Sequence, residues 1–310
     1  MADFRPGTPD QRELLSKLLA HRLLIETRVA GVYGHGRDFE TVCTGFAELI
    51  TRAGADDDPE RMAFPPVMPR HDLEAVDYLK SFPHLGGSIF AFSGGEREAD
   101  EQQERASRHQ DWSEFQSMTD LVLTPAACYP VYPAVAAHGP LPAGGVTVDA
   151  GGAYVFRHEP SSDPARLQMF RQREIVRIGE PETVEAWWCR WRERGVGLLS
   201  RVGLAVQLDV ATDPFFGRGG RILAASQREQ ALKFEITCQI AAPEPTALAS
   251  FNYHRDHFAS VFGIELADRR VVHTACIGFG LERIALALFR THGFALADWP
   301  PAVLGELSIV

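Results

Sequence analysis

The chain has 310 residues, 45% of them hydrophobic and 23% charged, and a formal net charge of -10. This composition is that of a globular protein with room for one large domain and a smaller one. The acidic balance argues against a broad non-specific hold on nucleic acid, because such binding needs clustered lysine and arginine. No apolar run approaches a membrane span, and residues 1–7 lack a signal-peptide core, so we expect a cytoplasmic protein with no membrane contact.

The N-terminal part of the chain has the apolar periodicity of helices. Residues 9–54 form two such runs, separated by residues 31–36, which contain three glycines. Residues 55–61 are acidic and are typical of a linker. We therefore predict an N-terminal helical segment over residues 1–60 and a second, larger unit over residues 61–310.

The larger unit alternates short apolar strands with a few helices. Residues 94–111 are charged and rich in glutamine, which favours a flexible or helical excursion. The predicted helices are 181–194, with its tryptophans on one buried face, and 281–289. The predicted strands are 88–92, 121–123, 146–149, 154–157, 169–178, 206–210, 233–240 and 272–277. We expect an α+β fold with a largely antiparallel sheet flanked by helices.

The five cysteines indicate no disulfide framework. They are Cys43, Cys128, Cys189, Cys238 and Cys276, an odd number at wide spacing, with no Cys-x-x-Cys pair. Reduced thiols are the default in that situation. Taken alone, each cysteine is best interpreted as a small buried apolar residue, and the spacing by itself indicates no metal site.

One compound motif points to chemistry on ATP. Arg157 and Glu159 are two residues apart on a predicted strand, and a polar loop separates them from Arg166, Phe170 and Glu174. Much later, Gly278 and Gly280 precede Arg283 at the start of a helix. An Arg-x-Glu pair alone is usually a solvated ion pair, and glycines open turns everywhere, so only the order and co-occurrence are informative. Together these residues resemble motifs 2 and 3 of the class II aminoacyl-tRNA synthetases.

The residue types suit the activation of an amino acid by ATP. Two anions meet when a carboxylate attacks the α-phosphate, and arginine can stabilise the charge that develops there. The resemblance implies catalytic roles for Arg157, at the α-phosphate and the substrate carboxylate, and for Arg283, at the far phosphates. It implies that Glu159 accepts a hydrogen bond from the adenine amino group, that Phe170 stacks on the adenine, and that Arg166 belongs to the ATP site.

The segment from residue 235 to residue 258 is similar to the one before motif 3 in seryl-tRNA synthetases. That likeness implies that Glu235 holds the Mg²⁺ bound to ATP and that Asn252 lies near the amino acid, where we also place Asp213. In the seryl-tRNA synthetases of methanogens, a zinc site has a loop cysteine, a motif 2 glutamate and a cysteine just before motif 3. The matching residues here are Cys128, Glu174 and Cys276. The alternative is that Cys276 only packs and that Glu174 only pairs with Arg173.

The short N-terminal segment is the main departure from the tRNA synthetases, because about sixty residues are too few for their tRNA-binding domain. A truncated core of this kind resembles the amino acid:[carrier protein] ligases. That family makes an aminoacyl-adenylate and passes the aminoacyl group to the phosphopantetheine thiol of an acyl carrier protein. The resemblance implies a small amino acid, glycine or alanine, and a homodimer. An enzyme that charges tRNA and a non-catalytic amino-acid-binding paralogue remain alternatives.

An acidic carrier protein would need a local basic patch on this acidic chain. The best candidate is the stretch of residues 218–233, which contains Arg218, Arg221, Arg228 and Lys233. Within it we expect a short helix over residues 222–232. The alternative is a positively charged surface that binds no partner, because most runs of charged residues are simply solvent-exposed faces.

Overall fold

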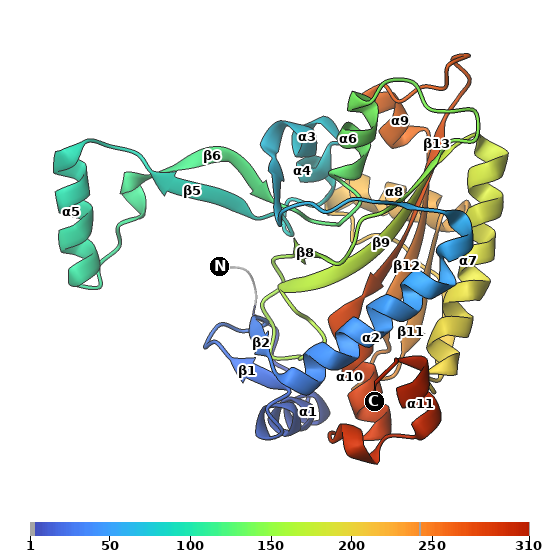
Figure 1. The fold of residues 1–310 in the computed structure, drawn as a ribbon. Helices are drawn as coiled ribbons and strands as arrows, with labels where there is room; N and C mark the ends of the chain where they lie inside the picture. Colours follow the sequence, from blue (N-terminus) through green and yellow to red (C-terminus); the bar gives the residue numbers. More distant parts are fainter. Residues whose placement is uncertain (1–3, 242, 310) are drawn as a thin grey trace.

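The computed structural model describes residues 4–241 and 243–309, which form an α+β fold around an eight-stranded sheet (Figure 1). The strands of this sheet lie in the order β10-β11-β12-β13-β9-β7-β3, and β8 also pairs with β9. All pairs are antiparallel except β3 with β7. The strands are β3 (Glu60–Arg61), β7 (Val146–Asp149), β8 (Ala153–Phe156), β9 (Met169–Gly179), β10 (Val206–Val210), β11 (Lys233–Cys238), β12 (Thr246–Arg255) and β13 (His273–Gly280).

Helices cover one face of the sheet and bury the larger apolar core. Leu18, Phe46, Trp191, Phe279 and Leu288 belong to this core, so the N-terminal helices pack into the same core as the sheet. The Oδ2 atom of Asp57 accepts hydrogen bonds from the indole N–H groups of Trp187 and Trp191. The helices are α1 (Pro9–Ala20), α2 (Arg37–Ala53), α7 (Pro181–Arg201), α10 (Leu281–His292) and α11 (Pro301–Glu306), with short 3-10 helices η1 (Ala55–Asp57) and η3 (Leu296–Asp298).

Smaller elements stand over the opposite face and at the edges of the sheet (Figure 1). A three-stranded sheet has the order β4-β6-β5, and a hairpin pairs β1 with β2. The strands are β1 (Leu24–Glu26), β2 (Tyr33–His35), β4 (Val67–Pro69), β5 (Ser88–Phe92) and β6 (Gln116–Leu123). The helices are α3 (Arg70–Ala75), α4 (Tyr78–Ser81), α5 (Glu96–Ser107), η2 (Ser113–Phe115), α6 (Val131–Ala137), α8 (Gly217–Glu229) and α9 (His257–Phe262).

The structure confirms the predicted fold class and most of the predicted elements. For residues 94–111 the sequence indicated a flexible segment or a helix as alternatives, and the structure has helix α5 there. The helix predicted over 222–232 begins five residues earlier as α8, and β12 was missed because its alanine and serine content has little strand character. The division of the chain at residue 60 stays a prediction. Among the described residues, none of the helices has the length and apolar character needed to cross a bilayer.

Candidate active site

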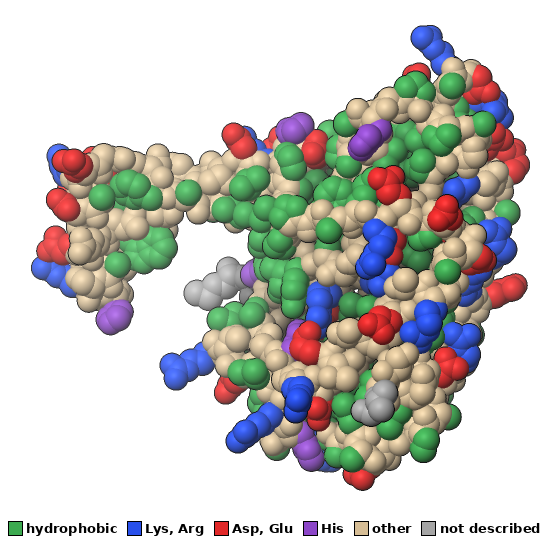
Figure 2. All heavy atoms as spheres, in the orientation of Figure 1, with side chains coloured by type: hydrophobic (Ala, Val, Ile, Leu, Met, Phe, Trp, Pro, Cys, Tyr) green, Lys and Arg blue, Asp and Glu red, His purple; other side chains and the backbone are tan. Residues whose placement is uncertain are grey.

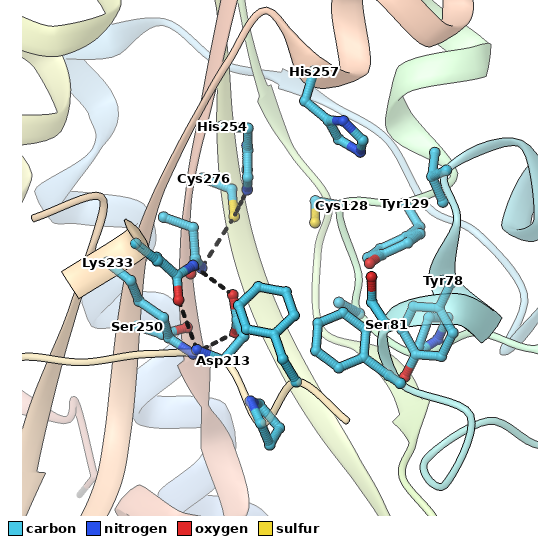
Figure 3. Close-up of a pocket in the computed structure, with 18 of the residues that line it drawn as sticks. Tyr78, Ser81, Cys128, Tyr129, Asp213, Lys233, Ser250, His254, His257 and Cys276 are labelled. Carbon is cyan, nitrogen blue, oxygen red and sulfur yellow. Dashed lines mark hydrogen bonds and ion pairs between the residues drawn. The ribbon is translucent and has the colours of Figure 1, made fainter. Parts of the chain in front are cut away.

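Four adjacent strands build the floor of the site because alternate side chains of a strand point to the same face. Gln172 and Glu174 of β9, Cys276 of β13, Asn252 of β12 and Lys233 of β11 all line one cavity of about 490 Å³. Its rim comes from α4, the loop before α6 and the segment before α8 (Figure 3). Gly278 of β13 leaves room for the Gln172 side chain, because a Cβ at position 278 would lie 2.5 Å from the Nε2 atom of Gln172 and would displace that amide.

The three predicted zinc ligands meet in this cavity. Cys128, Glu174 and Cys276 are buried, and their ligand atoms all lie within 4.8 Å of one another. Strand β9 holds the loop before α6 in place, since Glu174 Oε2 accepts a hydrogen bond from the backbone N–H of Cys128 at 2.7 Å. Arg173 pairs instead with Asp149, on the other face of the strand. The interpretation of Glu174 as only an Arg173 partner is therefore wrong.

The donor set fits zinc in chemistry and in size. Two thiols and a carboxylate suit this metal, and three protein ligands leave its fourth position open. Tetrahedral zinc places pairs of such ligand atoms roughly 3.5–3.8 Å apart, so small side-chain rotations suffice. Burial raises the pKa of Cys128, Cys276 and Glu174, which disfavours three anions here without a cation. A divalent ion reverses that preference, and the group could bind zinc.

Two polar side chains of β12 contact the Cys276 sulfur. The amide Nδ2 of Asn252 lies 3.6 Å from Sγ, and the Nε2 atom of His254 lies 3.7 Å from it (Figure 3). Burial lowers the pKa of His254 to about 3, so its imidazole is neutral at pH 7. Sequence reasoning assigned no role to His254. The available signal was its position two residues after Asn252 on a strand, which predicts the same face.

A buried lysine joins two of the predicted site residues. The Nζ atom of Lys233 lies 2.6 Å from Asp213 and 3.0 Å from Glu235. Gln227 of α8 holds the other Asp213 oxygen at 2.8 Å. Lys233 is only 6% exposed, so its predicted place in a surface patch for a carrier protein is wrong. Its side chain points inward because position 233 pairs with position 252 of β12, and paired residues of neighbouring antiparallel strands point to the same face.

The predicted ATP residues gather around Phe170, which is buried on β9. The guanidinium carbon of Arg157 lies 5.9 Å from the centre of this ring and that of Arg283 lies 5.5 Å from it. Arg283 also donates to the carbonyl of Ala165 at 2.9 Å. Burial and the nearby charge of Arg157 lower the pKa of Arg283 to about 10. Both arginines thus lie within about 6 Å of the ring centre, where a cation interacts with an aromatic ring.

The loop between β8 and β9 carries the remaining pair of predicted ATP residues. Arg166 and Glu159 approach to 3.6 Å, and both are partly exposed. Neither of them, nor Glu235, lines the cavity around the zinc residues. The two groups of residues therefore form adjoining parts of one face, with Arg157 lining the cavity and also lying over Phe170.

Helix α8 presents the remaining predicted arginines on its outer surface. Arg218, Arg221 and Arg228 are exposed. Large apolar side chains accompany them, since Ile222 is 72% exposed and Phe216 is 57% exposed. The helix also contributes Leu223 and Gln227 to the wall of the cavity. One side of α8 therefore borders the cavity while the other faces solvent.

Solved structures match this architecture over nearly the whole chain. The structure of M. kandleri SerRS in complex with A. aeolicus tRNASec superposes with a TM-score of 0.80 at 19% identity, covering 98% of this chain and 61% of that one. Prolyl-tRNA synthetase of Giardia lamblia superposes with a TM-score of 0.65 at 13% identity, covering 91% and 52%. Together with the arrangement of the strands, these similarities define a class II aminoacyl-tRNA synthetase catalytic fold.

Curated proteins of similar sequence assign the chain to a family within this fold. Amino acid–[acyl-carrier-protein] ligases 1 and 2 of Bradyrhizobium diazoefficiens are 43% and 45% identical over 308 and 309 residues. The alignments cover 98% and 99% of this chain, and 94% and 91% of the relatives. The chain belongs to the amino acid–[acyl-carrier-protein] ligase family. Type-2 serine–tRNA ligase of Methanococcus aeolicus is 25% identical over 281 residues, which are 84% of this chain and 52% of that protein. No family model matches the chain.

Proposed function

We propose that this enzyme activates a small amino acid, glycine or alanine, with ATP and transfers it to the phosphopantetheine thiol of an acyl carrier protein. The observation that carries the proposal is the meeting of Cys128, Glu174 and Cys276 in a cavity that Arg157 also lines. The metal site that would bind the α-amino group of the substrate and the arginine that would bind its carboxylate then lie in one pocket. The choice of glycine or alanine rests on the family resemblance alone.

ATP is bound beside this cavity, over Phe170. The adenine stacks on the Phe170 ring, and Glu159 accepts a hydrogen bond from the adenine amino group. Entry of the base requires Arg283 to swing away from the ring, which it now faces at 5.5 Å. Arg283, with Arg166 nearby, then binds the outer phosphates. Glu235 holds Mg²⁺ with the nucleotide, and to do so it gives up part of its contact with Lys233.

Arg157 is the main catalytic residue in adenylate formation. Its guanidinium binds the substrate carboxylate and the α-phosphate together, so that the nucleophile and the phosphorus meet in line. The same cation stabilises the charge that develops on the phosphate oxygens in the transition state. Pyrophosphate leaves, and the aminoacyl-adenylate remains in a largely buried pocket that limits its hydrolysis.

The amino acid is held by its backbone end. A zinc ion bound by Cys128, Glu174 and Cys276 would supply an open position for the unprotonated α-amino group. Asn252 donates toward the Cys276 sulfur and thereby orients that ligand. Asp213 is fixed by Lys233 and Gln227, and it borders the space next to the amine. An ionised Asp213 favours a substrate that carries an amino group.

Helix α8 is the proposed docking surface for the carrier protein. Carrier proteins are generally acidic, and Arg218, Arg221 and Arg228 are exposed beside Ile222 and Phe216. Cations around an apolar centre are the usual composition of a specific interface. Because Leu223 of the same helix lines the cavity, a carrier bound there has a short path for its thiol. The resemblance to class II cores also makes a homodimer part of the proposal.

The reaction is tested in two steps. Amino-acid-dependent ATP–pyrophosphate exchange with all twenty amino acids identifies the substrate, and glycine or alanine is expected to give the highest rate. Aminoacylation of a phosphopantetheinylated carrier protein, with tRNA in parallel, then identifies the acceptor. Exchange with no amino acid would contradict adenylate formation. Charging of tRNA but not of carrier protein would contradict the proposed acceptor.

Docking on α8 is tested by reversing charge at two exposed positions. Arg221→Glu with Arg228→Glu should lower the rate of transfer to the carrier and leave exchange unchanged. Added salt should reduce transfer by the wild type but have less effect on the variant. Arg61→Glu with Arg269→Glu is the matched control, because both arginines are exposed elsewhere on the chain. Equal transfer by both double variants would place the carrier elsewhere.

A further inference from the structure

The second half of the proposed reaction needs a group that accepts a proton. A thiolate attacks a carbonyl carbon far better than a thiol does, and an unperturbed thiol with a pKa of about 8.5 is only about 3% ionised at pH 7. Arginines at the phosphates cannot take the proton of an incoming thiol, because they are already protonated. A base that lines the cavity would remove this proton as the sulfur attacks.

The carboxylates that line the cavity are already engaged. They are Asp77, Glu174 and Asp213. Glu174 belongs to the metal group, and Asp213 lies 2.6 Å from the Nζ atom of Lys233. Asp77 lies 3.2 Å from Lys80, and its side chain is 65% exposed, so it faces solvent rather than a buried thiol. A histidine is therefore the better candidate for the base.

The two histidines of the cavity differ in what their rings contact. The Nδ1 atom of His254 lies 3.2 Å from the Thr274 hydroxyl, and its Nε2 atom lies 3.7 Å from the Cys276 sulfur. His257, the first residue of α9, lines the same cavity. Within residues 4–241 and 243–309, its ring makes no hydrogen bond or ion pair. Figure 3 shows this ring pointing from α9 into the cavity, toward the side where Cys128 lies.

The surroundings of His257 keep its imidazole neutral at pH 7. Partial desolvation lowers the pKa of His257 below its ordinary value of 6.5, although the charges of Asp77 and Asp256 act in the opposite direction. His254 of β12 also faces it and is itself neutral. Figure 2 shows mainly hydrophobic side chains on the surface over α6 and α9. A neutral imidazole at the edge of a cavity can accept a proton.

The reacting carbonyl would lie within the same space. In an amino acid, the α-amino nitrogen and the carbonyl carbon are two bonds apart, at about 2.5 Å. A substrate held by its amine beside Cys128 therefore keeps its carbonyl carbon next to the same loop. Leu223 of α8 borders the cavity that His257 lines, so a thiol that enters past α8 reaches both groups in one space of about 490 Å³.

We propose that His257 is the general base of the transfer step. Its imidazole takes the proton of the phosphopantetheine thiol while the sulfur attacks the carbonyl carbon of the aminoacyl-adenylate. The carbon–sulfur bond forms, the bond between that carbon and the phosphate oxygen breaks, and AMP leaves with the electron pair. The imidazolium then gives its proton to solvent. This inference rests on the proposed transfer to a thiol and adds a catalytic residue to it.

The inference is tested by separating transfer from adenylate formation. Enzyme that carries a preformed adenylate is mixed with a phosphopantetheinylated carrier protein or with free pantetheine, and the single-turnover rate is measured. His257→Gln should lower the rate with both acceptors by about a hundredfold or more, which is the usual contribution of a general base. ATP–pyrophosphate exchange should change much less, because the adenylate forms before a thiol reacts.

The pH dependence distinguishes a base from a residue that only positions the thiol. Between pH 7 and pH 8, transfer by the wild type should be nearly constant, because His257 is already neutral. Transfer by His257→Gln should rise about tenfold over this interval, because it depends on thiolate formed in solution. The defect of the variant should therefore shrink about tenfold from pH 7 to pH 8.

Two further variants complete the experiment. His257→Ala removes the ring, and added imidazole should restore part of its transfer activity. His71→Gln is the matched control, because His71 has a side chain that is 80% exposed and does not line the cavity. It should transfer at the wild-type rate. Exchange activity and circular dichroism check that each variant is folded.

The possible failures point to different errors. If the wild type transfers and His257→Gln transfers as fast, His257 is not the base. A defect of equal size at pH 7 and pH 8 would also overturn its role as a base. A wild type that forms the adenylate but acylates neither the carrier protein nor pantetheine would refute the proposed acceptor, and the base with it.

Discussion

Replacing Arg171 by methionine should destabilise the protein strongly, because this arginine joins three elements behind the ATP face. Its Nε atom donates to Glu282 of α10 at 2.7 Å, and its two terminal nitrogens donate to Glu40 of α2, each at 2.7 Å. The side chain of Glu282 is 0% exposed, whereas that of Glu40 is 41% exposed. Removal of the guanidinium would leave a buried carboxylate at Glu282 without a counter-charge.

The expected loss of stability follows from this difference in exposure between Glu282 and Glu40. Breaking a buried ion pair by removing one partner costs about 3–5 kcal/mol. Glu282 keeps one hydrogen bond from the backbone N–H of Arg171, at 2.8 Å, and Glu40 can be solvated. We therefore expect a loss of about 3 kcal/mol in the free energy of unfolding, near the lower end of that range. Urea unfolding followed by circular dichroism at pH 7 measures it.

A double variant separates the unpaired charge from lost packing. Adding Glu282→Gln to Arg171→Met removes the buried charge while keeping its shape, so the double variant should be more stable than Arg171→Met alone. A loss below about 1 kcal/mol for Arg171→Met would refute the reasoning, since that is the range of an exposed pair. So would a double variant that is less stable than the single one. Arg171 neighbours Phe170, and Glu282 neighbours Arg283, so the KM for ATP should rise more than the KM for the amino acid.

Three further predictions concern the site itself. Cys276→Ser should lower both bound zinc, measured by metal analysis, and exchange, whereas Cys189→Ser should change neither; full exchange by a zinc-free sample would contradict the metal assignment. Arg157→Ala should lower the exchange rate by a factor on the order of 10²–10³, and a change of only a few-fold would remove Arg157 from catalysis. The charge of Lys233 and hydrogen bonds from Lys233 and Gln227 hold the pKa of Asp213 below its usual range, although burial alone would raise it. The stability from Asp213 is therefore complete above the unfolded pKa of about 4 and is lost as the pH falls below it, so the difference in unfolding free energy between the wild type and Asp213→Asn should shrink from pH 6 to pH 3. A difference that stays constant over this interval would show that the pKa of Asp213 is the same in the folded and unfolded protein, and would refute the predicted lowering.

Local patterns in the sequence determined the elements and the chemistry of the chain. The apolar periodicity of α2 and α7 predicts their buried faces, because a helix repeats every 3.6 residues whatever it packs against. Alternation along a strand likewise predicts that Phe170 and Glu174 share a face. The motif residues point to ATP chemistry because few residue types suit the charges of that reaction.

Tertiary structure alone decided which of these residues meet. Cys128, Glu174 and Cys276 come from a loop and two strands up to 148 residues apart, and the register of β9 with β13 brings them within 4.8 Å. The same kind of pairing turned Lys233 inward to Asp213 and placed His254 beside Cys276. The exposure of Phe90 and Phe92 on β5 could not be predicted either, because alternating apolar residues fit an internal sheet as well as an open one. Long-range register and the presence or absence of a covering layer are properties of the packed chain, and no local pattern contains them.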